Sequence, residues 1–275
     1  MKPRMASRVF LVLFTAGAIL SPGSNAHAAN SVEINSCGQV LEGGGYLSAD
    51  LDCLGDTTDE PTLTVGSDGI VDLRGFTLTS RASEDVPTVV CDPRCTILGP
   101  GTIVGSPNGD GGVVGTPPYQ WSGTRVEVIG ATITGGSKGV VARRVSLQDA
   151  VISGNRHSGV WSFYAIVESS ELTGNGIGDN GLLSGTALVA QLKARVTDSH
   201  ISGNGKAGVV GPHTKLIHST VTGNDADPRC TTEICADLFG ESRPKLDSSS
   251  CDTSATVQWP GGTGAVQNWG VCDLD

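Results

Sequence analysis

The sequence predicts an all-β protein whose short strands stack as the coils of a parallel β-helix, with about 20 residues per coil. Three observations predict this fold: a recurring Ser/Thr-Gly-Asn/Gly tripeptide, aliphatic residues at two fixed positions before it, and small residues at a third position. The tripeptides begin at Thr134, Ser153, Thr173, Ser202 and Thr222. Their central glycines lie 19, 20, 29 and 20 residues apart, so one backbone unit repeats at a nearly constant period.

Counting backwards from each central glycine arranges the coils in columns. Seven residues before the glycine stand Val128, Leu147, Val167, Val196 and Leu216, and two residues before it stand Ile133, Ile152, Leu172, Ile201 and Val221. Four residues before it stand Ala131, Ala150, Ser170, Ser199 and Ser219. Because side chains alternate along a strand, the last two columns share an inward face. Asparagine tolerates the left-handed conformation of a tight corner, and we expect the stacked asparagines to hydrogen-bond from coil to coil.

The coil has the form Val-x-[Ile/Leu]-x-x-[Ala/Ser]-x-Ile-[Ser/Thr]-Gly-Asn, and in this respect it resembles the right-handed parallel β-helix superfamily with its pectin-lyase-like fold. The resemblance is strongest over residues 125–224, and residues 71–79 and 96–104 look like earlier coils. It implies that the coils are right-handed. The Cys37-Gly38 segment and the Trp269-Gly270-Val271-Cys272 end are similar to those of exported bacterial β-helix proteins of undetermined function.

The N-terminus has the layout of a secretory signal peptide: the basic residues Lys2, Arg4 and Arg8, an apolar stretch over 9–20, and Ala26-His27-Ala28. We predict cleavage after residue 28 and a secreted or periplasmic location. An uncleaved membrane anchor is the alternative, but a span needs about 20 apolar residues. Residues 29–275 then form a single domain, with an N-terminal cap at 29–65, coils at 66–229 and a C-terminal cap at 230–275.

Eight cysteines lie after the predicted signal peptide, which suits an oxidising compartment. Eight cysteines allow 105 pairings. Proximity in the sequence favours four local disulfides: Cys37 with Cys53, Cys91 with Cys95, Cys230 with Cys235, and Cys251 with Cys272. A zinc site is the competing interpretation, although the sequence contains no Cys-x-x-Cys motif. We expect the disulfides to staple the ends of the solenoid, where its core would otherwise meet water.

The charge distribution gives an indication of the binding partner. The formal net charge is −10, and −13 once Lys2, Arg4 and Arg8 are removed. Residues 125–224 nevertheless hold 9 bases and 6 acids, between two acidic ends. Such a chain is a poor general nucleic-acid binder, because that function needs a concentrated basic face. A local site for a polyanion on the coils remains compatible with these charges.

One outward column collects cationic and aromatic side chains, one per coil, ten residues before each central glycine. These residues are Arg125, Arg144, Tyr164, Lys193 and His213. At about 4.8 Å per coil, they form a ladder of roughly 19 Å. Its spacing is of the same order as the charge repeat of a carboxylated polysaccharide, so this ladder is the predicted binding face. A solvated outer face, whose long side chains merely cover the sheet, is the alternative interpretation.

Two further groups of polar side chains are candidates. Lys138, His157 and Lys206, three residues after a central glycine, form a broken basic column that we include among the candidate binding residues. In a second group, Asp198 and His200 share the outward side of one coil, with Glu171 one coil before His200 and His218 one coil after Asp198, and Asp149 stands in the column of Asp198. Such groups can perform acid-base chemistry or hold a cation. Exposed cross-strand ion pairs would explain the second group equally well.

No catalytic motif of the resembled superfamily is present. The Asn-Thr-Asp, Gly-His-Gly and Arg-Ile-Lys strings of polygalacturonase-like enzymes do not occur, nor does the Arg-x-Pro-x-x-Arg setting of pectate-lyase-like enzymes. The favoured function is therefore binding of an acidic polysaccharide or cell-surface glycan without a cofactor. The alternatives are an active polysaccharide lyase or epimerase, for which calcium is possible, and a structural or adhesive surface module. The sequence predicts no membrane partner after signal cleavage.

Overall fold

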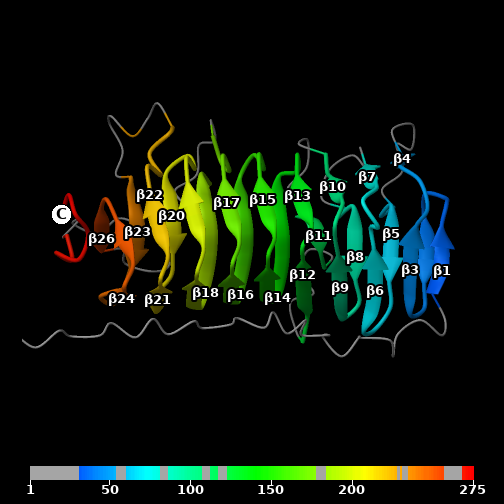
Figure 1. The fold of residues 1–275 in the computed structure, drawn as a ribbon, viewed down its shortest axis with the longest axis horizontal. Helices are drawn as coiled ribbons and strands as arrows, with labels where there is room; N and C mark the ends of the chain where they lie inside the picture. Colours follow the sequence, from blue (N-terminus) through cyan, green and yellow to red (C-terminus); the bar gives the residue numbers. More distant parts are fainter. Residues whose placement is uncertain are drawn as a thin grey trace, which may run out of the picture.

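The computed structural model describes residues 31–53, 60–80, 86–106, 112–116, 123–177, 184–227, 230, 235–256 and 268–275. The predicted signal peptide lies outside these residues. In the described part of the chain the regular elements are β-strands, and their ladders are parallel. Figure 1 shows the strands stacked from the N-terminal to the C-terminal end of an elongated molecule. No described helix is long and apolar enough to cross a membrane.

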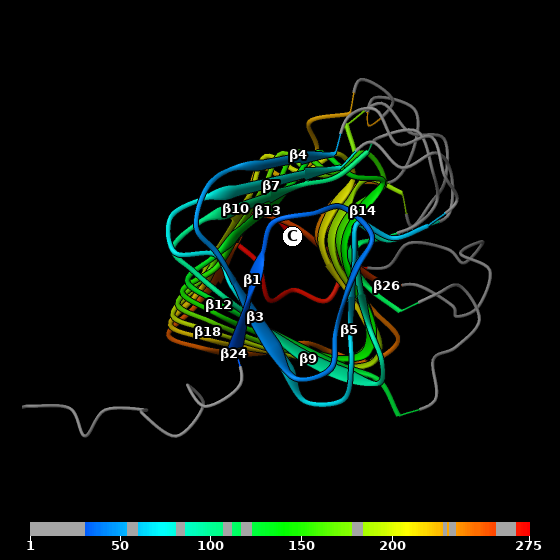
Figure 2. The same cartoon turned by 90° about the vertical axis from the view of Figure 1, so that its right-hand side faces the viewer.

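The strands form three rows along the stack, and Figure 2 shows them around a common interior. The first row contains β1 (Ser31–Ile34), β3 (Gly44–Leu47), β6 (Gly69–Asp72), β9 (Arg94–Leu98), β12 (Arg125–Ile129), β14 (Lys138–Gln148), β16 (Ser158–Glu168), β18 (Thr186–Thr197), β21 (Thr214–Ile217) and β24 (Lys245–Asp247). The second contains β2 (Gln39–Leu41), β5 (Leu63–Val65), β8 (Val89–Cys91), β11 (Gly112–Gly115), β20 (Ala207–Val210), β23 (Ala236–Gly240) and β26 (Ser254–Thr256), together with the first halves of β14, β16 and β18.

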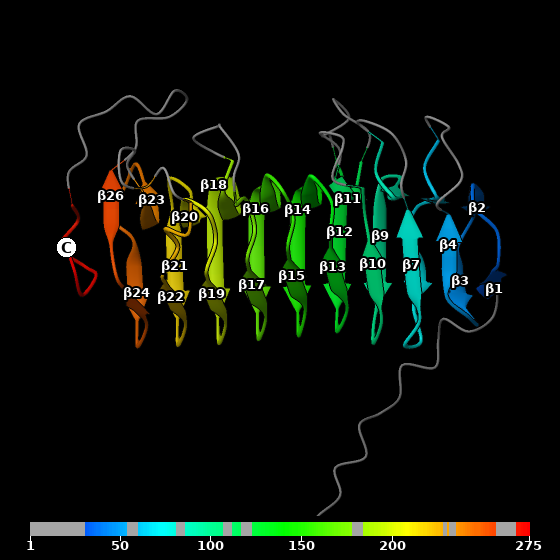
Figure 3. The same cartoon turned by 90° about the horizontal axis from the view of Figure 1, so that it is seen from above.

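The third row is a separate nine-stranded sheet, seen from above in Figure 3. It contains β4 (Leu51–Cys53), β7 (Thr77–Ser80), β10 (Thr102–Val104), β13 (Thr132–Thr134), β15 (Val151–Ser153), β17 (Glu171–Thr173), β19 (His200–Ser202), β22 (Thr220–Thr222) and β25 (Ser250–Cys251). The long strands β14, β16 and β18 join the first two rows into one 17-stranded sheet. This arrangement is compatible with the expected parallel β-helix.

The predicted aliphatic columns form the core. In the third row, Ile133 is the register partner of Ile152, and the same column continues through Leu172, Ile201 and Val221. These five side chains are 0% exposed, and so are the five aliphatic residues of the first-row column that begins at Val128. Burial of stacked aliphatic side chains is the main stabilising contribution to such a fold. The columns predicted from the sequence are therefore confirmed.

Buried asparagines connect the coils at the corner after the third row. Asn155 Nδ2 donates to Asn175 Oδ1 (2.9 Å), Asn175 Nδ2 to Asn204 Oδ1 (3.0 Å), and Asn204 Nδ2 to Asn224 Oδ1 (2.7 Å). Each Oδ1 also accepts the backbone N–H of the preceding asparagine, as Asn204 Oδ1 does from Asn175 N (2.9 Å). The predicted asparagine ladder is confirmed, and it satisfies backbone groups that the corners leave without a strand partner.

Asp237 ends this asparagine ladder as a pure acceptor. Its Oδ1 receives both Asn224 Nδ2 (2.7 Å) and Asn224 N (3.0 Å), and its Oδ2 receives the backbone N–H groups of Asp252 (2.9 Å) and Thr253 (3.0 Å). Burial raises the pKa of the Asp237 carboxyl above its ordinary value, although the hydrogen bonds from Asn224, Thr253 and Asp252 act in the opposite direction.

A serine ladder lines the opposite corner, between the first and third rows. Ser170 N donates to Ser199 Oγ (3.0 Å), Ser199 N to Ser219 Oγ (3.2 Å), and Ser219 N to Ser249 Oγ (3.0 Å). Each of these serines is preceded by a residue in the left-handed conformation, for example Asp198 with φ of 48°. Short polar side chains visit this conformation at the lowest cost after glycine. The corner residues are therefore held with their side chains directed away from the core.

The four predicted disulfides are confirmed: Cys37–Cys53, Cys91–Cys95, Cys230–Cys235 and Cys251–Cys272. They indicate an oxidising, extracellular type of environment. The stapled segments are part of the stack itself. Within 29–65, strands β1 to β5 already pair in parallel with neighbouring strands, and within 230–275 the strands β23 to β26 continue the rows.

Residues 268–275 follow the last described strand, and a disulfide and hydrogen bonds join them to β25 and β26. Cys272 is bonded to Cys251, and Trp269 Nε1 donates to Ala255 O (3.2 Å). The Asp275 carboxylate accepts hydrogen bonds from Ser254, from Val271 N (2.9 Å) and from Cys272 N (3.0 Å). Partial burial raises the pKa of Asp275, but the hydrogen bonds together outweigh it and leave this pKa below its ordinary value.

Candidate functional site

The predicted ladder occupies one outward row of the first row of strands. Arg125 is the register partner of Arg144, Arg144 of Tyr164, and Tyr164 of Lys193. His213 directly precedes β21, and its carbonyl accepts the N–H of Ala194 (3.0 Å). The ladder therefore continues to His213, whose Nδ1 lies 3.1 Å from Ser242 Oγ. The structure brings these five residues together as consecutive positions of one surface.

Alternation along each strand turns the cations outward. In β12 the side chains of Val126 and Val128 are 0% exposed, whereas Arg125, at the start of the same strand, is exposed. Arg144 and Lys193 are exposed in the same way, and Tyr164 is half-buried. The Arg144 guanidinium lies 5.6 Å from the centroid of the Tyr164 ring, within the range of a cation–π contact. An extended anionic chain could thus meet both charge and an aromatic face.

The structure adds cations that the sequence reasoning did not place on this surface. Arg94 of β9 is the register partner of Arg125 and also pairs with Asp68 (2.8 Å). Two residues after Lys193, at the next outward position of the strand, Arg195 is the register partner of Lys215, and Lys215 is the register partner of Lys245. We call the outward surface formed by these residues and the ladder the basic face. Its members are Arg94, Arg125, Arg144, Tyr164, Lys193, Arg195, His213, Lys215 and Lys245.

The basic face carries a surplus of positive charge. On the described first-row strands from β9 to β24, three carboxylates, those of Glu127, Glu168 and Asp247, stand against the seven lysine and arginine cations of the basic face. Among the described residues, the ammonium groups of Lys193, Lys215 and Lys245 have no ion pair. These charges therefore remain available to a ligand.

The second predicted basic column is not continuous. Lys138 is the register partner of Ser158, so His157 is one residue out of line. Lys138 Nζ lies 5.8 Å from the Trp161 ring centroid, away from the basic face. Lys206 is only 1% exposed, because its stem lies over Gly185, where a Cβ would come within 2.9 Å of Lys206 Cγ. Lys206 is thus a buried lysine, contrary to the expectation of an exposed corner.

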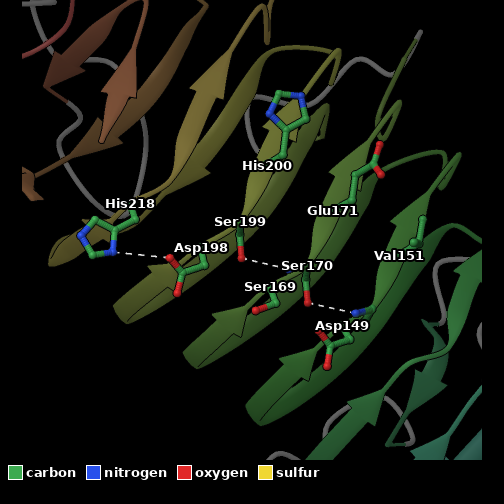
Figure 4. A pocket seen from close by; sticks show the side chains of 10 residues that line it. Asp149, Val151, Ser169, Ser170, Glu171, Asp198, Ser199, His200 and His218 are labelled. Carbon is green, nitrogen blue, oxygen red and sulfur yellow. Dashed lines mark hydrogen bonds and ion pairs between the residues drawn. The ribbon is translucent and has the colours of Figure 1, made fainter. Parts of the chain in front are cut away.

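A shallow groove of about 490 Å³ runs along the corner between the first and third rows. It is lined by Asp149, Ala150, Val151, Ser169, Ser170, Glu171, Asp198, Ser199, His200 and His218. His218 Nδ1 lies 3.4 Å from Asp198 Oδ1, and both side chains are exposed. Figure 4 shows these residues on successive coils, with His200 and Glu171 on the neighbouring strands β19 and β17.

The groove gathers imidazole and carboxylate groups that can exchange protons, as the sequence suggested. In the described part of the chain, no group of three or more such side chains is arranged to hold a metal ion. The groove begins where the strands of the basic face end, because Asp198 and His218 directly follow β18 and β21.

Comparison with known proteins gives no match to a protein-family model, to a curated protein or to a solved structure. The basic face and the corner groove are therefore the two features of the molecule from which a function can be inferred.

Proposed function

We propose that this protein is an exported binding protein for an acidic polysaccharide or cell-surface glycan, and that the basic face is its binding surface. We further propose that its coils are right-handed, as in the pectin-lyase-like superfamily that its coil sequence resembles. Binding needs no cofactor in this account. Export is supported by the signal-peptide pattern of residues 1–28 and by the four disulfides.

One observation carries the proposal: like charges stand opposite each other in register. Arg94, Arg125 and Arg144 are consecutive partners in one outward row, and Arg195, Lys215 and Lys245 are consecutive partners in the next. Like charges directly opposite each other on neighbouring strands destabilise a sheet. A surface under no functional demand would lower this repulsion by alternating its charges. A bound polyanion removes the repulsion and supplies the missing opposite charges.

The geometry fits a linear ligand that lies along the stack. Neighbouring strands are about 4.8 Å apart, so the outward row offers a cation or aromatic ring at each step. Arginine can hold a carboxylate or sulfate through two parallel hydrogen bonds. Tyr164 lies within the row and offers a ring face for contact with a sugar.

The test is direct binding of the purified protein to polygalacturonate, alginate and a sulfated glycosaminoglycan. We expect retention that falls when salt is raised to about 0.5 M, because exposed charges are then screened beyond a few ångströms. The variant Arg144→Ala/Lys215→Ala should bind at least about tenfold more weakly, since two charge-assisted hydrogen bonds of at least about 1 kcal/mol each are lost.

A matched control keeps the same change in net charge. Arg143→Ala/Arg156→Ala also removes two exposed cations, one over Phe163 on the neighbouring part of β14 and one at a corner. This control should bind as the unmodified protein does. Equal losses in the two variants would show a general charge effect, and absence of binding to all three polymers would refute the proposed function.

A further inference from the structure

The left-handed corner column contains an aspartate, a histidine and a serine on three successive coils. Thr197 is the register partner of Ile217, and Ile217 of Asp247. The residues that follow, Asp198, His218 and Ser248, therefore occupy equivalent corners about 4.8 Å apart. Their φ angles are 48°, 47° and 49°. The order along the stack places His218 between Asp198 and Ser248.

The histidine is oriented by the aspartate. Asp198 Oδ1 lies 3.4 Å from His218 Nδ1, which favours the tautomer that carries its proton on Nδ1. In Figure 4 the other ring nitrogen, Nε2, points to the side of the ring away from Asp198. The register puts the coil of Ser248 on that side. Nε2 is thus the ring nitrogen available to accept a proton from a group on the next coil.

Ser248 has a free hydroxyl in a constrained backbone. Its side chain is exposed and has no hydrogen-bond partner among the described residues. Its φ of 49° is the left-handed corner conformation that Asp149, Ser169, Asp198 and His218 share. A sharp turn is a known way to expose the oxygen of a nucleophilic serine to a substrate.

In the described part of the chain, the backbone N–H groups of Ser248 and Ser249 lack acceptors because β24 is the last described strand of its row. In the preceding coil the equivalent donors are occupied: His218 N donates to Asp247 O (2.8 Å), and Ser219 N donates to Ser249 Oγ (3.0 Å). The N–H groups of Ser248 and Ser249 have no such partner in the described part of the chain. Free backbone N–H groups next to a nucleophile can stabilise the oxyanion of a tetrahedral intermediate.

We propose that Asp198, His218 and Ser248 form an acyl-transfer site that hydrolyses a carboxylic ester. Ser248 is the nucleophile, His218 is the general base, Asp198 is a positioning residue for the imidazole, and the N–H of Ser249 binds the oxyanion. The roles follow the Ser-His-Asp arrangement, which is recognised by geometry and not by the order of the residues in the chain. The Ser248–His218 hydrogen bond forms when substrate binds, as catalytic hydrogen bonds often do.

The reaction balances with water as the only co-reactant. Ser248 Oγ attacks the ester carbonyl carbon while its proton moves to His218 Nε2. The carbon–oxygen bond to the alcohol then breaks, and the departing oxygen takes that proton. Water attacks the acyl-serine with His218 again accepting a proton, which returns to Ser248 Oγ as the carboxylic acid leaves. No oxidant, reductant or metal is consumed.

The surroundings indicate the class of ester. The site lies at an exposed corner, so it accommodates an ester group on a larger molecule. Lys215 and Lys245 stand three residues before His218 and Ser248 on the strands that lead to the corner. Their charges favour an ester whose other groups are anionic. This site is separate from the glycan-binding proposal, because a small neutral ester suffices to detect it.

The experiment combines hydrolysis of p-nitrophenyl acetate with labelling by a fluorophosphonate and peptide mapping. We expect the label on Ser248. Ser248→Ala and Ser248→Gly should abolish both labelling and the catalysed rate, and the glycine variant retains a residue that favours positive φ. His218→Gln should lower the rate at least about a hundredfold, the usual contribution of a general base. Asp198→Asn should lower kcat without raising KM, which a merely structural role would not produce.

Ser169 provides the matched control. It has φ of 48° in the same column, but it lies on the opposite side of Asp198 from His218. Ser169→Ala should hydrolyse the ester as the unmodified protein does, and Ser169 should remain unlabelled. Hydrolysis equal to that of folded Ser248→Gly, or equal labelling of Ser169 and Ser248, would overturn the proposal. Thermal unfolding of each variant confirms that it is folded.

Discussion

Replacing Asn204 by leucine removes the middle member of the asparagine ladder with little change in side-chain volume. Asn204 is 0% exposed. Its Oδ1 accepts Asn175 N (2.9 Å) and Asn175 Nδ2 (3.0 Å). Its Nδ2 donates to Asn224 Oδ1 (2.7 Å), Leu172 O (3.0 Å) and Ser202 O (3.1 Å). Because the leucine side chain neither accepts nor donates, all five hydrogen bonds are lost at once.

The expected cost follows from what remains satisfied. Asn175 Nδ2 keeps Ile152 O (3.0 Å), and Asn224 Oδ1 keeps the backbone N–H of Asn204 (3.3 Å). Among the described residues the N–H of Asn175 has no second acceptor, so it becomes a buried unsatisfied donor, which costs about 1–3 kcal/mol. The other four bonds contribute about 0.5–1.5 kcal/mol each. Partial compensation by the apolar side chain leaves a loss of at least about 3 kcal/mol.

The assay is thermal unfolding followed by circular dichroism. For a chain of this size, a loss of about 3 kcal/mol lowers the Tm by about 6–12 °C. The control is Asn35→Leu, the same chemical change at an exposed position where the one hydrogen bond to the described residues uses the backbone N–H. The control should change the stability by less than about 0.5 kcal/mol. Equal Tm values for the two variants would refute the view that the asparagines hold the coils together.

Three further results are expected. Cys251→Ser/Cys272→Ser should lose about 3 kcal/mol of stability, the loop-closure value for a sequence separation of 21 residues, as measured by denaturant unfolding. Because folding lowers the pKa of Asp275, this carboxylate stabilises the protein above its ordinary pKa, and the stabilisation is lost as the pH falls through the folded-state pKa. The free energy of unfolding of Asp275→Asn, measured against pH, should therefore show a smaller decrease at acid pH than that of the unmodified protein. Ser199→Ala removes the acceptor of Ser170 N (3.0 Å) and should lower the Tm by a few degrees, consistent with about 1 kcal/mol.

The sequence predicted the register because the repeat marks it directly. Every coil from Gly135 to Gly223 carries a Ser/Thr-Gly pair at the same point, and a side-chain period of two then determines which strand residues face inward. The aliphatic columns, the asparagine ladder and the row from Arg125 to Lys193 all follow from that register. The disulfide pairings were predicted from proximity, which succeeds here because the bonded cysteines lie only 4 to 21 residues apart in the sequence.

The basic column of Lys138, His157 and Lys206, predicted three residues after the central glycines, is not continuous for a local reason. The corner at Arg156 holds one residue more than the preceding one, so Lys138 pairs with Ser158 instead of His157. Lys206 follows a coil that is nine residues longer, and the glycine at 185 opens the space that its stem fills. Insertions and glycine neighbours alter corners without altering the strands. Corner positions are therefore less predictable than strand positions.

Two groups of site residues were not selected from the sequence. Arg195 and Lys215 stand eight residues before a central glycine, a column that the same alternation would have revealed. Ser248 belongs to a coil in which Asp252-Thr253-Ser254 replaces the tripeptide, so the repeat gives no sign of it. Only the register partners across β21 and β24 show that Ser248 follows His218 in the column.

The length dependence of oligouronate binding tests the basic face most directly. If the ligand lies along successive coils, the affinity measured by calorimetry should rise with chain length until the oligosaccharide spans the row from Arg125 to Lys193, and then level off. That row covers three steps of about 4.8 Å between neighbouring strands. A monosaccharide that binds as tightly as a long chain, or an absence of binding at every length, would contradict the account.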